Sequence, residues 1–244
     1  MPIDYGIYNS GALFLKIGSS ARLKMYAKFL ELAKPSESDL VLDVGVTPNN
    51  ATLGNNFFEK LYPYTKNITM CTVEDAKNLE SEFPGAKFVR NTAGEPLPFA
   101  DKQFDIVFCS AVIEHTGDYP EQEKFLAELI RVGKKVFLTT PNKNFPVELH
   151  TVLPFVHWLP RKIHQNILSM LGMRFYAKTE NLNLLNAKRI KIFMSNLKQI
   201  IPPPPPPRAL RYEITYNRLL GLRSNIILFI ESPNSKGDCR NGNC

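Results

Sequence analysis

The sequence lacks the features that mark several protein classes. Its 244 residues include four cysteines and one tryptophan. No apolar run approaches the ~18–20 residues that a membrane-spanning helix needs. Asp4 stands where a signal peptide would carry positive charge, and no apolar core with a cleavage site follows it. We therefore expect neither a transmembrane segment nor secretion, and a cytoplasmic location.

The few cysteines fall into two environments. Cys71 and Cys109 lie in apolar, strand-like runs and are expected to be reduced thiols in the core. Cys239 and Cys244 lie in the polar segment 233–244, which we expect to be a flexible tail. A zinc site would need further ligands near them, so the sequence predicts no metal site.

Charge is distributed unevenly along the chain. The net charge of +7 combines −3 over residues 1–150 with +10 over residues 151–244. A basic C-terminal part is compatible with phosphate, an acidic glycan, an anionic membrane surface or nucleic acid. A solvated basic face without a partner is equally compatible with this charge.

Helical and strand-like patterns alternate through the first 140 residues. Apolar residues at helical spacing predict a helix over 21–33, and further helices are expected at 55–64, 74–83 and 120–132. Short apolar runs predict buried strands at 40–45, 68–73, 86–91, 104–115 and 134–140. This alternation is typical of a parallel sheet covered on both faces, which binds ligands beyond the carboxyl ends of its strands.

The alternation stops after the fifth predicted strand. Residues 144–185 are rich in proline and contain three histidines and the single tryptophan, so we expect an inserted helical cap. A helix capped by Asn186 follows, and then Pro202–Pro207, a predicted polyproline spacer. Two closing strands are expected at 212–217 and 224–231.

The predicted fold is therefore α/β: a Rossmann-like, seven-stranded, mostly parallel sheet with helices on both faces and an inserted helical cap. The expected organisation is a core at 1–143, the cap at 144–185, closing elements of the same domain at 186–232, and the tail at 233–244.

The order of three motifs is more specific than any one of them. VLDVG at 41–45 is followed by LPFADKQFDIVFCSAVIEH at 97–115 and FLAELIRVGKKVFLTTPN at 125–142. The G-x-G-x-x-G fingerprint is absent, which disfavours hydride transfer. Over residues 21–232 the order resembles the class I S-adenosylmethionine-dependent methyltransferases, in the small-molecule branch called type 11. The stretch 139–160 resembles members from bacterial polysaccharide and glycolipid gene clusters.

This resemblance implies S-adenosylmethionine as cofactor and assigns it four segments, one after each of the first four strands. The first would surround the methionine and ribose, and the second would accept the ribose hydroxyls. The third would lie beside the adenine, and the fourth would line the methyl-transfer centre. In chain order the residues are Asp43, Gly45, Val46 and Thr47; Glu74 and Asp75; Gly94 and Glu95; Ser110 and Ala111.

Three positions depart from the family pattern. Thr47 replaces a glycine, and the usual ribose and adenine acids fall on Thr72 and Ala93. Each acidic candidate also has a structural alternative: capping of backbone N–H groups for Asp43, stabilisation of a helix N-terminus for Glu74 and Asp75, and simple solvation for Glu95. These departures keep open a non-catalytic relative that uses the fold for interaction.

On the acceptor side, Glu114 and His115 lie where the fourth strand opens toward the substrate. His115 is the candidate general base, with an unperturbed pKa of about 6.5, or else it holds its loop by hydrogen bonds. Glu114, His150 and Trp158 are candidate acceptor-binding residues, although packing on the core is the default expectation for Trp158.

The sequence thus predicts methyl transfer to a small-molecule acceptor, such as a hydroxyl of a glycan or glycolipid precursor. Peripheral contact with an anionic membrane is a further hypothesis. An RNA-modifying or nucleic-acid-binding protein is the alternative suggested by the basic C-terminal part, although no RNA-binding signature is present. The oligomeric state is not predicted.

Overall fold

The computed structural model describes residues 12–50, 54–200 and 210–232. Three predicted features lie outside the described residues: the polyproline spacer Pro202–Pro207, the tail 233–244, and the two cysteines in that tail.

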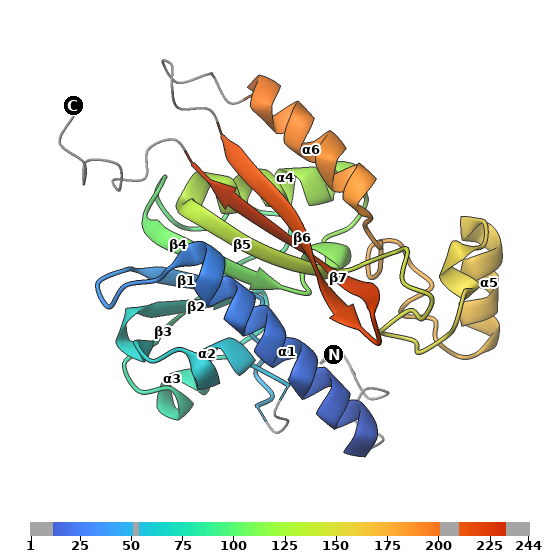
Figure 1. Ribbon diagram of the computed structural model, residues 1–244, viewed down its shortest axis with the longest axis horizontal. Coiled ribbons are helices and arrows are strands. Elements are labelled where there is room, and N and C mark those ends of the chain that lie inside the picture. Colours follow the sequence, from blue (N-terminus) through green and yellow to red (C-terminus); the bar gives the residue numbers. More distant parts are fainter. Residues whose placement is uncertain (1–11, 51–53, 201–209, 233–244) are drawn as a thin grey trace.

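The chain folds around one seven-stranded sheet with strand order β3-β2-β1-β4-β5-β7-β6 (Figure 1). Strands β1 to β5 pair in parallel, whereas β7 runs antiparallel to both β5 and β6. The predicted mostly parallel sheet is therefore confirmed. The strands are β1 Val41–Val44, β2 Ile68–Thr72, β3 Lys87–Arg90, β4 Phe104–Ser110, β5 Gly133–Pro141, β6 Arg211–Leu219 and β7 Leu222–Glu231.

Helices cover both faces of the sheet, as predicted. They are α1 Ala12–Ala33, α2 Phe57–Leu61, α3 Leu79–Glu82, α4 Tyr119–Val132, α5 Arg161–Met170 and α6 Ala187–Ile200. Three short 3-10 helices join them: η2 Thr65–Asn67, η3 Ile113–His115 and η4 Val156–Trp158. None of the helices in the described part of the chain is long and apolar enough to cross a membrane.

Two hydrophobic clusters lie on opposite faces of the sheet. Helices α4 and α6 pack on one face, and α1 and α2 pack on the other. Strand β4 supplies both, because Val107 and Cys109 face the first cluster while Ile106 and Phe108 face the second. This alternation follows from the two-residue period of a strand. Cys71 and Cys109 are buried free thiols, as expected.

Three predicted elements were too long, and the first of them is the helix expected at 55–64, of which only α2 forms. The fourth strand was expected to reach His115, but β4 ends at Ser110 because Ala111 adopts a left-handed φ of 57° that cannot continue a strand. The helix expected at 74–83 is only α3. The Asp75 carboxylate accepts a hydrogen bond from the Lys77 backbone N–H, which holds a turn ahead of the helix.

Side chains cap both later helices, and the cap predicted at Asn186 is confirmed. The Asp118 carboxylate accepts a hydrogen bond from the backbone N–H of Glu121 at the start of α4. The amide oxygen of Asn186 accepts one from the backbone N–H of Arg189 at the start of α6. Between β5 and α6 the chain forms η4 and α5, and α5 stands apart from the sheet (Figure 1).

Lys102 ties the end of α4 to the last strand. Its ammonium group donates to the backbone carbonyls of Ile130 and Gly133, the latter at 3.0 Å, and to the Ser232 hydroxyl at 2.6 Å. Burial lowers the pKa of Lys102 to about 8. A partly buried cation therefore satisfies carbonyls at the C-terminus of α4 that have no partner within the helix.

Lys102→Met should lower the free energy of unfolding at pH 7 by about 1–3 kcal/mol, because buried acceptors lose their donor. Denaturant unfolding measures the change, and Lys124→Met on the exposed side of α4 is the control. Above pH 8 the folded wild type binds fewer protons than the unfolded chain, so its stability should rise toward pH 10 while that of Lys102→Met does not. Equal stabilities of wild type and Lys102→Met at pH 7 would contradict this role.

Candidate functional site

The candidate residues gather where the parallel strands end. Strand β1 lies between β2 and β4, with Val44 beside both Cys71 and Cys109. Strand β4 pairs with β5, and Ser110 lies beside Thr139. Because parallel strands end at one edge of a sheet, the loops that follow them share one side of the molecule.

Gly45 makes the turn that follows β1. Its φ is +103°, and its backbone N–H donates to the Cys71 carbonyl at 2.8 Å. A Cβ at this position would lie 2.1 Å from Cγ2 of Val112, so only glycine fits. The group that comes close to the Gly45 backbone is thus the Val112 side chain of the protein itself.

The rest of the first loop is held by Asn56. Its side-chain amide accepts a hydrogen bond from the backbone N–H of Thr47 at 3.0 Å and donates one to the carbonyl of Thr47 at 2.9 Å. Val46 is buried in the cluster under α1 and α2. Sequence reasoning missed Asn56, which lies nine residues after Thr47 and fixes the loop.

Asp43 and Glu59 form a buried pair of carboxylates beneath this loop. Asp43 lies on β1, Glu59 on α2, and both are almost inaccessible. Burial, and then the negative charge of Glu59, raises the pKa of Asp43 well above its ordinary value, and burial raises the pKa of Glu59. Neither oxygen of Glu59 has a hydrogen-bond partner in the described part of the chain. The sequence indicated Asp43 but not Glu59.

The segments after β2 and β3 are more open. Glu74 is half-buried, and Asp75, Gly94 and Glu95 are exposed. Gly94 has a φ of +80°, and a Cβ there would meet no atom within 4 Å. Glu74 and Asp75 precede α3 by several residues, so they do not occupy its first turn.

The end of β4 leads directly into the acceptor-side residues. The Ser110 hydroxyl lies 2.9 Å from the Thr139 hydroxyl on β5, and the backbone N–H of Ala111 donates to the Thr139 carbonyl. The left-handed turn at Ala111 then directs the chain into η3, which carries Glu114 and His115. A left-handed alanine is uncommon and is maintained here by these contacts.

Glu114 is fully buried at the base of the acceptor side. Its Oε2 accepts a hydrogen bond from the Thr140 hydroxyl at 2.9 Å, while Oε1 has no hydrogen-bond partner among the described residues. A buried carboxylate oxygen without a donor is costly, so this atom requires a physical explanation.

His115 lies beside this carboxylate. Its Nδ1 lies 2.6 Å from the Asn181 carbonyl, so Nδ1 carries the hydrogen and Nε2 keeps its lone pair. Burial lowers the pKa of His115, which favours the neutral imidazole. The two roles considered for His115 are therefore compatible, because one ring nitrogen holds the loop and the other is free for chemistry.

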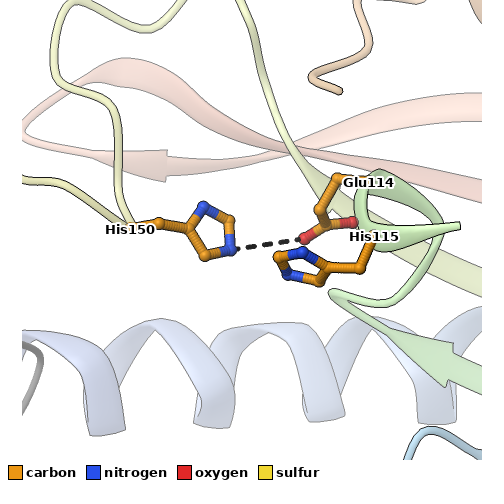
Figure 2. A group of neighbouring side chains, drawn as sticks. All are labelled: Glu114, His115 and His150. Atoms are coloured by element: carbon orange, nitrogen blue, oxygen red, sulfur yellow. Dashed lines mark ion pairs between the residues drawn. The ribbon is translucent and has the colours of Figure 1, made fainter. Parts of the chain in front are cut away.

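His150 reaches the same place from the segment after β5. Its Nδ1 lies 2.7 Å from Oε1 of Glu148, and its Nε2 lies 3.9 Å from Oε1 of Glu114 (Figure 2). Burial opposes ionisation of Glu148, but hydrogen bonds from His150 and Thr151 lower its pKa to about 2. Burial also opposes protonation of His150, but the Glu148 carboxylate raises its pKa overall. Sequence reasoning missed Glu148 and Thr140.

Glu114, His115 and His150 thus form one cluster, with a potential ligand atom from each within 4.8 Å of the others. The sequence analysis expected no metal site and did not anticipate that these three side chains would lie together. A signal was present, since Glu114 and His115 follow β4 while His150 follows β5, and neighbouring parallel strands end side by side.

The remaining cap residues lie apart from this cluster. Trp158 is 49% exposed, so the default expectation of core packing was wrong. Its indole N–H donates to the Lys143 carbonyl, which orients the ring outward beside Phe155. His157 is buried on η4 and His164 lies on α5. The cap histidines, which follow one another at intervals of seven residues, therefore do not share one helix.

Glu59→Gln should raise the free energy of unfolding at pH 7.5 by about 1 kcal/mol, because it removes one of two buried like charges. The raised folded-state pKa values mean that the pair favours folding only at acid pH, and that this contribution is lost as pH rises. Thermal unfolding should therefore show wild type and Glu59→Gln converging toward pH 4. Glu37→Gln on the surface is the control, and a less stable Glu59→Gln at pH 7.5 would contradict the repulsion.

Comparison with known proteins agrees with this geometry. Residues 42–136 match a family described as Methyltransferase domain. The chain is 37% identical over 68 residues to the ubiquinone biosynthesis O-methyltransferase of Aromatoleum aromaticum, which is 27% of this chain and 29% of that protein. It is 30% identical over 98 residues to the enzyme of that name from Idiomarina loihiensis, 38% of each chain. The chain covers 22% of the corresponding protein from Coxiella burnetii strain Dugway 5J108-111, with 38% identity over 52 residues.

Solved structures share the fold at low sequence identity. Magnesium protoporphyrin IX methyltransferase from Synechocystis PCC 6803, solved with bound SAH, superposes with a TM-score of 0.52 and 13% identity over 93% of this chain and 91% of that one. A SAM-dependent methyltransferase structure from Methanosarcina mazei superposes with a TM-score of 0.50 and 15% sequence identity, over 81% of this chain and 94% of that one. The chain therefore has the fold of class I S-adenosylmethionine-dependent methyltransferases, as the resemblance implied, its residues 42–136 match the methyltransferase domain family, and S-adenosylmethionine is the cofactor that this match indicates.

Proposed function

We propose that this protein transfers the methyl group of S-adenosylmethionine to a hydroxyl of a small-molecule acceptor, in particular a glycan or glycolipid precursor. The observation that carries the proposal is the Glu114, His115 and His150 cluster at the strand ends, next to the first-loop and β4 positions assigned to the cofactor. The curated relatives named as O-methyltransferases support an oxygen acceptor.

The residues at the strand ends fit such a cofactor. Glu74 offers a half-buried carboxylate to which no hydrogen bond is made within the described residues, which suits a pair of ribose hydroxyls. The open space over Gly94 leaves room for a flat base. S-adenosylmethionine supplies a methyl group already activated on a positively charged sulfur. The protein must align that group with the acceptor and exclude water.

We assign acceptor activation to His115. Its neutral ring presents Nε2 to the cluster while Nδ1 is engaged with Asn181, so Nε2 can take the proton of an acceptor hydroxyl. Glu114 and His150 would hold the same hydroxyl or a neighbouring one. The segment 144–185 would cover the acceptor, since it contributes His150 and the loop around Asn181.

Calorimetric titration with S-adenosylmethionine and S-adenosylhomocysteine tests the cofactor. We expect saturable binding to wild type, at least tenfold weaker binding to Asp43→Asn, and unchanged binding to the surface control Glu37→Gln. A folded protein that binds neither ligand would overturn the proposal in favour of a non-catalytic relative. RNA binding with a steep salt dependence would favour the RNA alternative instead.

We also propose that the cap region touches an anionic membrane from the cytoplasmic side, where a lipid-linked acceptor would be met. Large apolar side chains are exposed on η4, on α5 and just beyond α5: Phe155, Trp158, Leu159, Ile163, Met170, Leu171 and Phe175. Basic residues are interleaved with them, at Arg161, Lys162, Arg174 and Lys178. Apolar side chains together with basic ones are typical of interfacial binding.

Flotation with vesicles tests this contact. The protein should float with phosphatidylserine-containing vesicles at low salt, less so at high salt, and not with neutral vesicles. Met170→Asp with Leu171→Asp should abolish flotation. Leu220→Asp, at a 93% exposed position on the β6–β7 turn, should not. No association with anionic vesicles at low salt would refute the proposal.

A further inference from the structure

Glu114, His115 and His150 are arranged as metal-binding side chains are arranged. The three residues offer one carboxylate oxygen and two imidazole nitrogens that all lie within 4.8 Å of one another (Figure 2). They come from η3 and from the segment after β5, so the tertiary structure brings them together. Three donors within this distance can surround a single cation.

The carboxylate supplies an independent observation. Glu114 is fully buried, and its Oε1 has no hydrogen-bond donor among the described residues, although its other oxygen is bonded to Thr140. Oε1 points toward Nε2 of His150 at 3.9 Å, too far for a hydrogen bond (Figure 2). A bound cation would neutralise the Glu114 carboxylate and coordinate the lone pair of Oε1 that accepts no hydrogen bond from the described residues.

In both histidines Nδ1 is already engaged, so Nε2 is the ring nitrogen that remains for coordination. The Nδ1 atom of His115 is engaged by the Asn181 carbonyl, and that of His150 by the Glu148 carboxylate. Metal-binding histidines ordinarily donate their other ring N–H to such an acceptor, which fixes the tautomer and the ring. Glu148 is in turn held by Thr151 through both its backbone N–H and its hydroxyl.

We propose that Glu114, His115 and His150 bind one divalent transition-metal ion, with the remaining coordination positions open to the acceptor. Two imidazoles and one carboxylate suit Zn²⁺, Mn²⁺ or Co²⁺ better than Mg²⁺ or Ca²⁺, which prefer oxygen ligands. Three protein ligands leave room for an exogenous oxygen, as in catalytic metal sites.

The role of this ion in methyl transfer rests on the proposed function, whereas the binding of the ion does not. With the cation bound, Nε2 of His115 is a ligand and no longer takes a proton. The acceptor hydroxyl coordinates the ion and releases its proton to water, because a bound cation lowers the pKa of an attached O–H. The oxygen then forms a bond to the methyl carbon as the carbon–sulfur bond breaks, and the products are a methyl ether and S-adenosylhomocysteine.

Direct metal titration tests the site without any enzymatic assay. The full-length protein is stripped with a chelator and titrated with Co²⁺, followed by its visible absorption and by calorimetry. We expect one ion per chain, and competition by Zn²⁺. Glu114→Gln and His150→Asn should weaken binding at least tenfold, and Glu148→Gln should weaken it 10–100-fold by releasing the ring of His150. His164→Asn, a cap histidine outside the cluster, is the matched control and should bind as wild type does.

The outcomes separate the two proposals. Circular dichroism and S-adenosylmethionine titration of each variant show whether it is folded and able to bind cofactor. Cofactor binding without saturable Co²⁺ binding would overturn the metal site and leave the proposed function standing. Co²⁺ binding without cofactor binding would retain the site and overturn the function. Equal Co²⁺ affinity in Glu114→Gln and wild type would show adventitious binding and overturn the assignment.

Discussion

The parallel pairing of β1 with β4, and of β4 with β5, is the constraint on which the rest of the structure depends. The pairing places Val44 beside Cys109 and Ser110 beside Thr139, so these strands end at one edge. Helices cover both faces, which leaves that edge as the place where polar side chains can meet a ligand. The first loop, the turn at Ala111 and η3 all follow from this arrangement.

The buried carboxylates near this edge differ in their hydrogen-bond partners and in the charges beside them. Glu148 accepts hydrogen bonds from His150 and Thr151, and its pKa falls to about 2 despite burial. Asp43 faces Glu59, and burial with like charge raises the pKa of Asp43 instead. Glu114 has one oxygen bonded to Thr140 and the other without a hydrogen-bond partner among the described residues. A carboxylate whose oxygens all accept hydrogen bonds holds the neighbouring side chains in place. A carboxylate oxygen that lacks a donor can instead bind a cation or a ligand.

Most of the fold could be predicted because its signals are local. Apolar runs located all seven strands, and Asn186 correctly marked the start of α6. The errors arose where a single residue changes the backbone. Ala111 ends β4 early by adopting a left-handed conformation, and Asp75 holds a turn where a helix was expected. Neither conformation follows from hydrophobic periodicity, since both depend on specific hydrogen bonds.

The sequence by itself determined the alternating architecture and the order of motifs that matches the methyltransferase domain family, and it singled out Asp43, Gly45 and His115 as candidates. Only the tertiary structure decided what these residues touch. It set Val112 against Gly45, Glu59 against Asp43, and His150 beside Glu114. The physical reason is that strand propensity and helix periodicity are properties of neighbouring residues. A buried charge, by contrast, depends on partners that the chain brings close only when the sheet has formed.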